Sequence, residues 1–265
     1  MNSDNPYDAY APGEIARQVE EIGVTKANLP NMKILMLAIL AGAFIALGAA
    51  FYTLVITNSG LGFGPERLLG GIAFSLGLIL VIVGGAELFT GNNLIVMAWA
   101  DRKVSTLLLL RNWFFVFMGN FVGAMATALI VSWSGIFELG GGAVGETAVR
   151  IATAKVALPF DQAFFRGVLC NVLVCLAIWL CFAAHSVISK IVAILFPISA
   201  FVALGFEHSV ANMYLIPAGM LAGAGEIAPI DFAINLFFVT GGNILGGSVL
   251  VALVYWLAYI KFTRT

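Results

Sequence analysis

The sequence predicts an all-α integral membrane protein in which six transmembrane helices form two inverted three-helix repeats, with helices 2 and 5 broken midway. Composition is the first observation: 61% of the 265 residues are hydrophobic and 10% are charged, whereas roughly a quarter of a soluble domain is charged. Six long apolar runs are the second observation, and a motif that occurs twice is the third. A soluble enzyme is therefore nearly excluded, and the net charge of −1 argues against a nucleic-acid partner.

The six runs have the length that a bilayer requires, because about 20 apolar residues cross its hydrocarbon core. The expected spans are residues 34–57, residues 68–86, the stretch between Arg111 and Glu138, the stretch between Arg166 and His185, a short run after Lys190, and the stretch between Asp231 and Lys261. The run after Lys190 meets Glu207 and His208 before it is long enough to cross the bilayer comfortably.

The N-terminal residues 1–30 are expected to form a cytoplasmic amphipathic segment, because they hold five acids and lack the apolar core of a cleavable signal peptide. A helix that starts near Pro12 would place Ile15, Val19 and Ile22 on one face. This helix is either an ordinary surface helix or a flap near a pore mouth. Residues 31–262 would form the transmembrane domain, with repeats at about 31–134 and 147–262 and a cytoplasmic tail at 263–265.

The distribution of Lys and Arg predicts that both termini of this multi-pass protein lie on the cytoplasmic side of the cytoplasmic (inner) membrane, because short cytoplasmic connections carry an excess of positive charge. The termini and the 2–3 and 4–5 connections hold Arg17, Lys26, Lys33, Arg102, Lys103, Arg111, Lys190, Lys261 and Arg264, whereas the other side holds Arg67, Arg150, Lys155 and Arg166.

Two motifs recur at nearly equal offsets. The pattern G-x-E-x-x-x-x-N at residues 85–92 returns at 205–212, and the pattern N-x-F-F-x-x-x-G-N-x-x-G at 112–123 returns at 235–246. These ordered matches indicate an internal duplication. Because each half holds three spans, an odd number, the second half must be inserted upside down relative to the first.

The first motif places a glycine and a carboxylate inside apolar sequence, which predicts that spans 2 and 5 are broken there. Backbone amides near residues 90–92 and 209–212 would then be free and would attract anions through their partial positive charge. We expect Glu87 and Glu207 to tie loop amides together, since a negative charge facing the lumen would repel an anion.

His208 lies inside the expected break of span 5, where an ionisable side chain is a functional candidate. Moving a bare small anion through hydrocarbon has an idealised cost of order 20 kcal/mol. Lys155, on a helix-like stretch at 146–158, would attract an anion towards a narrow entrance, or else it is an exposed loop lysine. His208 would then pass a proton to the anion, since the reference pKa of imidazole is about 6.5.

Other polar residues in the spans are expected to support the structure. Asn120, Asn171 and Asn243 would each hold loop backbone or face a lumen. The three cysteines show no metal-ligand pattern, so neither a metal site nor a cofactor is expected. The residues assigned to structural polar support are Glu87, Glu207, Asn92, Asn212, Asn120 and Asn243.

At these residues the sequence resembles the formate/nitrite transporter family, and the resemblance runs through the whole chain. The motifs that carry it are G-A-E-L-F-T-G-N at 85–92, L-C-N-V-L-V-C-L-A at 169–177, G-F-E-H-S-V-A-N-M at 205–213 and G-N-I-L-G-G at 242–247. The resemblance implies an aquaporin-like six-helix protomer and a homopentamer in the lipid bilayer with one pore per protomer. It also implies passage of small monovalent anions or their acids, with the proton as a second partner.

The resemblance implies roles for individual residues. Thr90 would lie on the loop that breaks span 2, His208 would be the central pore histidine, and Asn171 would hydrogen-bond near it. Lys155 would be the vestibule lysine. The apolar lining would comprise Phe74 and Leu78 on one side of His208, together with Leu88, Val174 and Phe201.

Within the family, the formate-channel branch fits best, on Asp4-Asn5-Pro6-Tyr7-Asp8 and on residues 70–80. The expected function is a formate channel or proton-coupled carrier. Nitrite, hydrosulfide, acetate and lactate stay as alternatives, because Gly91-Asn92-Asn93 and a short 5–6 connection depart from familiar formate channels. A neutral-solute or water pore is disfavoured because paired Asn-Pro-Ala turns are missing, and a membrane-bound enzyme because no nucleophile–base pair or metal cluster is present.

Overall fold

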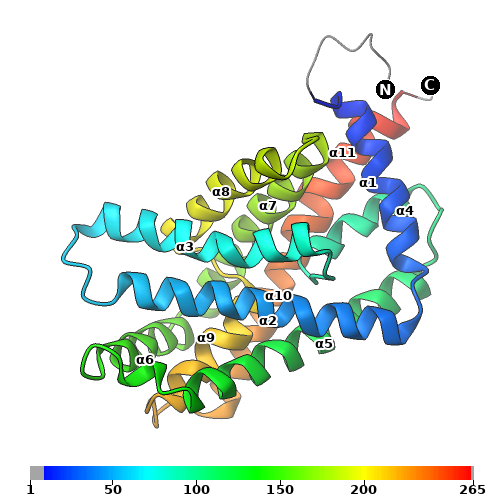
Figure 1. The fold of residues 1–265 in the computed structure, drawn as a ribbon. Coiled ribbons are helices and arrows are strands. Elements are labelled where there is room, and N and C mark those ends of the chain that lie inside the picture. Colours follow the sequence, from blue (N-terminus) through cyan, green and yellow to red (C-terminus); the bar gives the residue numbers. More distant parts are fainter. Residues whose placement is uncertain (1–8, 264–265) are drawn as a thin grey trace.

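The computed structural model describes residues 9–263, and these residues form helices and connections without a strand. The helices pack into one bundle, in which the last long helix of the chain runs obliquely to the first two (Figure 1). We call the end of the bundle that carries α1 the termini side, and the end that carries α6 the opposite side. The motif at residues 4–8 and Arg264 lie outside the described residues. The elements are α1 (Pro12–Ala27), α2 (Asn31–Ile56), α3 (Phe63–Gly84), η1 (Gly91–Ile95), α4 (Val96–Ala100), α5 (Thr106–Trp133), η2 (Ile136–Glu138), α6 (Ala143–Val156), α7 (Phe160–Ala183), α8 (Val187–Ala203), α9 (Ser209–Leu221), α10 (Pro229–Ile244), η3 (Leu245–Leu253), α11 (Val254–Trp256) and η4 (Leu257–Lys261).

Within residues 9–263, five helices are long and apolar enough to cross a membrane by themselves: α2, α3, α5, α7 and the continuous stretch Pro229–Lys261. The remaining crossing is shared by two short helices, α8 with 17 residues and α9 with 13. The expected all-α fold with six crossings is therefore confirmed, and the protein is a multi-pass membrane protein.

Both expected breaks are present, and each begins at a glycine with a left-handed backbone. Gly85 follows α3 with a φ of 79°, and Gly205 follows the end of α8 with a φ of 72°. Glycine adopts this conformation without a side-chain clash. The next residue closes each helix end in the same way, since Ala86 N–H donates to Val81 O at 2.9 Å and Phe206 N–H donates to Phe201 O at 3.0 Å.

Two close helix crossings show the same repeat. A Cβ added at Gly123 of α5 would overlap the carbonyl oxygen of Ile39 on α2, and one added at Gly246 would overlap that of Val168 on α7. Small residues let helix backbones approach closely in membranes. The crossing of α2 with α5 is thus repeated by the crossing of α7 with the last long helix.

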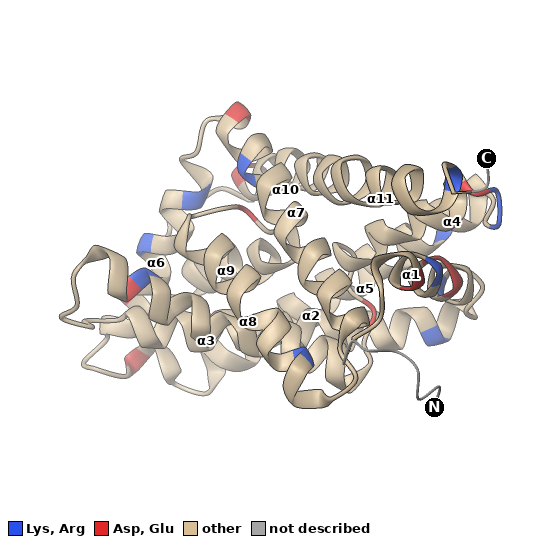
Figure 2. Cartoon of the chain, turned by 90° about the horizontal axis from the view of Figure 1, so that it is seen from above, with Lys and Arg blue, Asp and Glu red and all other residues tan. Residues whose placement is uncertain are grey.

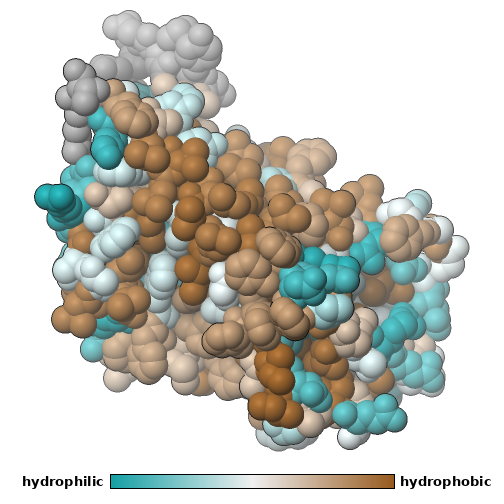
Figure 3. Space-filling view, turned by 180° about the vertical axis from the view of Figure 1, so that it is seen from behind, coloured by the Kyte–Doolittle hydropathy of each residue, from teal (hydrophilic) through white to brown (hydrophobic). Residues whose placement is uncertain are grey.

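The outer surface matches a membrane environment. Charged residues gather near the two ends of the bundle, while the long helices between them are almost free of them (Figure 2). Apolar side chains cover most of the middle of the face shown in Figure 3. Phe114, Phe196 and Phe237 are 61%, 72% and 74% exposed. Such a contiguous apolar surface contacts lipid or another protein.

Candidate functional site: the meeting point of the two broken helices

The loops of the two breaks meet inside the bundle at one polar contact. Thr90, on the loop after α3, and His208, directly before α9, are both buried. Thr90 Oγ1 lies 3.0 Å from His208 Nε2. The site therefore joins residues from both repeats at a depth where apolar side chains surround them.

His208 is held in one orientation by the helix that follows it. Its Nδ1 accepts the backbone N–H of Ala211 at 3.1 Å, so the ring caps the N-terminus of α9. A ring nitrogen that accepts a hydrogen bond carries no proton, so the neutral ring has its proton on Nε2. The Phe201 ring stacks on the imidazole with the centroids 5.9 Å apart. The Nε2–H group consequently points at Thr90.

Two asparagines hold the broken backbone in equivalent ways. Asn120 Oδ1 accepts the N–H of Phe89, and its Nδ2 donates to the carbonyls of Ala38 and Glu87. Asn243 Oδ1 accepts the N–H of Ser209, and its Nδ2 donates to the carbonyls of Gly167 and Glu207. These amides, rather than the carboxylates, tie the loops together. Our expectation for the carboxylates was wrong in this respect, since their oxygens bind side chains.

Each glutamate instead binds a lysine and an asparagine. Lys155 Nζ donates to both oxygens of Glu207, at 2.9 and 3.0 Å, and Asn212 Nδ2 donates to Glu207 at 2.7 Å. In the first repeat, Glu87 accepts from Lys26 Nζ at 2.9 Å and from Asn92 Nδ2 at 2.7 Å. A buried carboxylate needs such partners, because removing it from water is costly. The same carboxylate cluster thus occurs once on each side of the site.

Sequence reasoning missed the role of Lys26, although the sequence carries the signal. The pattern K-x-x-L-P at residues 26–30 recurs at 155–159. The backbone contacts of the two lysines are equivalent as well: the carbonyl of Lys26 accepts a hydrogen bond from Asn112 Nδ2, and the carbonyl of Lys155 accepts one from Asn235 Nδ2. The two lysines lie near the C-terminal ends of α1 and α6. The matching contacts therefore extend to these two short helices.

Asn171 links the two breaks from α7. Its Nδ2 donates to the backbone carbonyl of Thr90 at 3.2 Å and to that of Asn243 at 2.7 Å. The side chain is fully buried. It therefore fixes the backbone of Thr90, the residue whose hydroxyl lies beside His208, and in the described structure its Nδ2 donates to these two carbonyls rather than to His208.

Two of the amides that we expected to be free are bound inside the protein. Asn243 Oδ1 takes the N–H of Ser209, and His208 Nδ1 takes that of Ala211. The N-terminus of α9 is therefore largely satisfied by side chains, His208 directly before it and Asn243 of α10. The expectation of a row of open amides at this helix end was wrong, because side chains from both repeated motifs, His208 of 205–212 and Asn243 of 235–246, accept these N–H groups.

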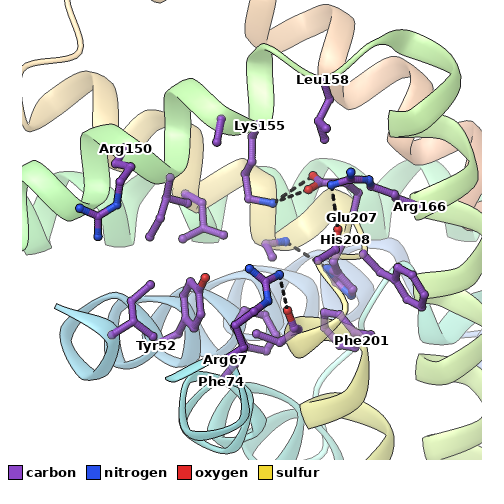
Figure 4. A pocket seen from close by; sticks show the side chains of 18 of the residues that line it. Tyr52, Arg67, Phe74, Arg150, Lys155, Leu158, Arg166, Phe201, Glu207 and His208 are labelled. Atoms are coloured by element: carbon purple, nitrogen blue, oxygen red, sulfur yellow. Dashed lines mark hydrogen bonds and ion pairs between the residues drawn. The ribbon is translucent and has the colours of Figure 1, made fainter. Parts of the chain in front are cut away.

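Two cavities approach the site from the two ends of the bundle. The larger, about 300 Å³, lies on the opposite side, and Phe74, Lys155, Phe201 and His208 border it (Figure 4). The smaller, about 80 Å³, lies on the termini side, and Lys26 and Leu88 border it. Of the remaining predicted residues, Thr90, Asn171, Leu78 and Val174 are buried and border neither of these two cavities.

Apolar rings narrow the larger cavity beside His208. Phe74 of α3 and Phe201 of α8 meet edge to face, with the centroids 5.6 Å apart. On the other side, α1 packs against η1 and α4 over the smaller cavity, with Ile15 and Val19 buried. Ile22 is 38% exposed, but it borders that cavity. Among residues 9–263, no group of three potential metal ligands is found.

Comparison with known proteins agrees with this arrangement. The family model described as "Formate/nitrite transporter" matches residues 13–257. The chain is 40% identical over 280 residues to "Formate channel FocA" of Escherichia coli (strain K12), covering 98% of both chains. It is 40% identical over 268 residues to "Probable formate transporter" of Methanothermobacter thermautotrophicus, covering 95% of this chain and 97% of the relative.

A solved structure described as "Pentameric formate channel with formate bound" superimposes with a TM-score of 0.82. It is 40% identical, and the match covers 87% of this chain and 98% of that one. The matches span nearly the whole chain, including both breaks and the residues between them. The chain therefore belongs to the formate/nitrite transporter family.

Proposed function

We propose that this chain conducts small monovalent anions, formate first among them, across the cytoplasmic membrane. The observation that carries the proposal is the contact between Thr90 and His208, a polar pair placed where two broken helices meet between two cavities. The names of the two relatives and of the solved structure described above support formate as the permeant.

The structure offers three aids to an anion that leaves water. Lys155 borders the larger cavity and Lys26 the smaller one. A lysine ammonium has three N–H donors. Each of these groups makes two hydrogen bonds within the described structure, so a third donor can serve a passing anion. The third aid is the hydroxyl of Thr90 beside His208 Nε2.

The proton step depends on the histidine ring. In the neutral ring, Nε2–H donates a hydrogen bond to Thr90 Oγ1, and the Thr90 hydroxyl can then donate a hydrogen bond to an anion. A second proton would have to occupy Nδ1, which now accepts from Ala211. We propose that the proton is a second partner and that acidification acts on transport through the hydrogen bond between His208 Nδ1 and the N–H of Ala211. A charged ring loses this hydrogen bond, so the N-terminus of α9 would be held less firmly.

The proposal includes the assembly of the protein and its orientation in the membrane. A homopentamer in the lipid bilayer, with one pathway in each protomer, is supported by the pentameric neighbour and by the exposed phenylalanines around the bundle. Cytoplasmic termini are supported by the excess of Lys and Arg on the termini side. The shared lysine–glutamate clusters support α1 as part of the first repeat and α6 as part of the second.

The experiment is uptake by proteoliposomes that contain the purified protein. Labelled formate should enter far faster than in protein-free liposomes, and unlabelled nitrite or acetate should compete according to how well each is conducted. Glycerol entry should match that of protein-free liposomes. Entry of water or glycerol without formate would reject the proposal in favour of a neutral-solute pore.

A further inference from the structure

The larger cavity holds more positive charge than the Lys155–Glu207 pair accounts for. Three arginines border it: Arg67 from α3, Arg150 from α6 and Arg166 from α7. Figure 4 shows Arg67 and Arg166 close to the Lys155–Glu207 pair, and Arg150 farther along α6 in the lining of the same cavity. Among the described residues, no ion pair within 4.0 Å joins any of these three guanidinium groups to a carboxylate.

Two of the arginines crowd together at the end of α8. Arg67 donates to the carbonyls of Ala203 and Val202, and Arg166 donates to that of Gly205 at 3.5 Å. A Cβ added at Gly205 would lie 2.8 Å from Arg67 Nη2 and 3.8 Å from Arg166 Nη1. The carbonyls at a helix C-terminus attract cations. The two guanidinium groups nevertheless repel each other, because both are positive and both lie beside Gly205.

The net charge of the cavity lining is two positive. Four cations and two carboxylates border it, and Lys155 and Glu207 neutralise each other. The second carboxylate, Glu66, accepts a hydrogen bond from Ser59 at 2.5 Å and therefore faces the 57–62 connection. Two uncompensated positive charges in a partly enclosed space match a ligand with two negative charges.

We propose that this cavity binds a short dicarboxylate dianion that is not itself conducted and that excludes the permeant anion. A guanidinium has five N–H donors, so each arginine keeps donors for a carboxylate besides the one or two hydrogen bonds that it makes within the protein. The dianion stops at Phe74 and Phe201, because two charges are more costly to desolvate than one. Its position in front of His208 then blocks entry from the opposite side. The blocking effect rests on the proposed function, whereas the binding does not.

The test uses succinate as the probe and isothermal titration of the purified full chain in detergent at low ionic strength. One succinate should bind per chain. Arg150→Gln and Arg166→Gln should each weaken it about tenfold, the effect of losing one charge-assisted interaction. Arg150 is exposed and makes only a 3.3 Å hydrogen bond within α6, so this variant should fold. Arg102→Gln, which removes an exposed charge on the termini side, is the matched control and should bind as the unmodified chain does.

Two further arms separate charge from geometry and binding from transport. In mildly alkaline buffer, acetate carries one charge and inorganic phosphate is mainly a dianion without a second carboxylate, and both should bind more weakly than succinate. External succinate should slow formate entry into proteoliposomes in the unmodified chain and much less in Arg150→Gln. Absent succinate binding, equal binding by all the variants, or phosphate binding as tight as succinate would overturn the proposal. Absent formate uptake with intact succinate binding would instead reject only the proposed function.

Discussion

Thr90 Oγ1 and His208 Nε2 lie 3.0 Å apart, although 118 positions separate the two residues and they belong to different repeats. His208 has a leucine, Leu88, at its counterpart in the first motif, and Thr90 has a valine, Val210, in the second. The duplicated scaffold thus supplies one polar partner from each half. This contact has no equivalent at the other repeat, so it departs from the pseudo-two-fold symmetry that relates the two halves.

Replacing Thr90 tests the hydroxyl of this pair. Thr90→Val keeps the shape of the side chain but leaves His208 Nε2 without its partner, which costs about 1–3 kcal/mol for a buried group. Formate uptake by proteoliposomes should fall about tenfold or more, since 1.4 kcal/mol is a factor of ten. Thr90→Ser retains the hydroxyl and should stay within about twofold of the original rate. Equal uptake by the valine and serine variants would show that the hydroxyl plays no part.

Asn243→Ala tests the support of the second break. It removes three hydrogen bonds with buried backbone groups: the N–H of Ser209, and the carbonyls of Gly167 and Glu207. The loss should exceed about 2 kcal/mol, because the backbone partners stay buried without replacement. Thermal unfolding in detergent should show a clearly lower Tm. Asn28→Ala, which removes one exposed hydrogen bond to Val24, is the control and should change the Tm little. Similar Tm values for both variants would contradict the assigned role.

The lysine–glutamate clusters can be divided into a structural and an electrostatic part. Lys155→Met leaves Glu207 buried and unpaired, which costs about 3–5 kcal/mol and should lower the Tm. The double variant Lys155→Met/Glu207→Gln should recover most of this loss, because no uncompensated charge remains. Both variants should slow uptake at low formate concentration, because the cavity loses its lysine. If the double variant regains full uptake as well as stability, Lys155 serves only the fold.

The contact between α1 and the 101–105 connection predicts a dependence of stability on pH. Burial raises the pKa of Glu20 from its usual 4.5, although its hydrogen bond to Lys103 opposes this effect. The Glu20 carboxylate in turn raises the pKa of Lys103, so the lysine stays charged in acid and at neutral pH. Between 4.5 and the raised pKa of Glu20, the folded chain binds more protons than the unfolded chain.

The free energy of unfolding should therefore fall as the pH rises through this window. In Glu20→Gln this fall should be absent, so the Tm of the variant relative to the unmodified chain should increase from about pH 4 towards about pH 7, across the reference pKa of a glutamate. Tm values in detergent at several pH values provide the measurement. A relative Tm that decreases over the same range would reverse the sign and exclude the account.

Most of the fold could be predicted from the chain because its signals are local. The long apolar runs give the spans, and the glycine and glutamate of the repeated motif give the breaks. The partners of the polar residues could not be read in the same way. Which groups an asparagine contacts depends on helix packing. The backbone N–H groups of Phe89 and Ser209 therefore donate to Asn120 and Asn243, and not to the glutamates as we expected.

The role of Lys26 shows a second limit. Its pattern recurs in the chain, but its offset of 129 from Lys155 differs from the 120 of the motif around Glu87, so the match is easily overlooked. Only the equivalent contacts with Glu87 and Glu207 reveal it. The charge distribution placed Arg67, Arg150 and Arg166 on one side of the membrane, but the cavity that they share could not be predicted, since they belong to three elements that meet only in the folded bundle.

The most direct test of the account is formate uptake by proteoliposomes that carry the unmodified chain or His208→Phe, measured from about pH 5 to about pH 7, either side of the free imidazole pKa. The account predicts that uptake by the unmodified chain changes over this range and that the variant loses the pH dependence. Uptake by His208→Phe with the same rate and the same pH profile would contradict it, because the permeant would then pass without meeting the pair that joins the two repeats.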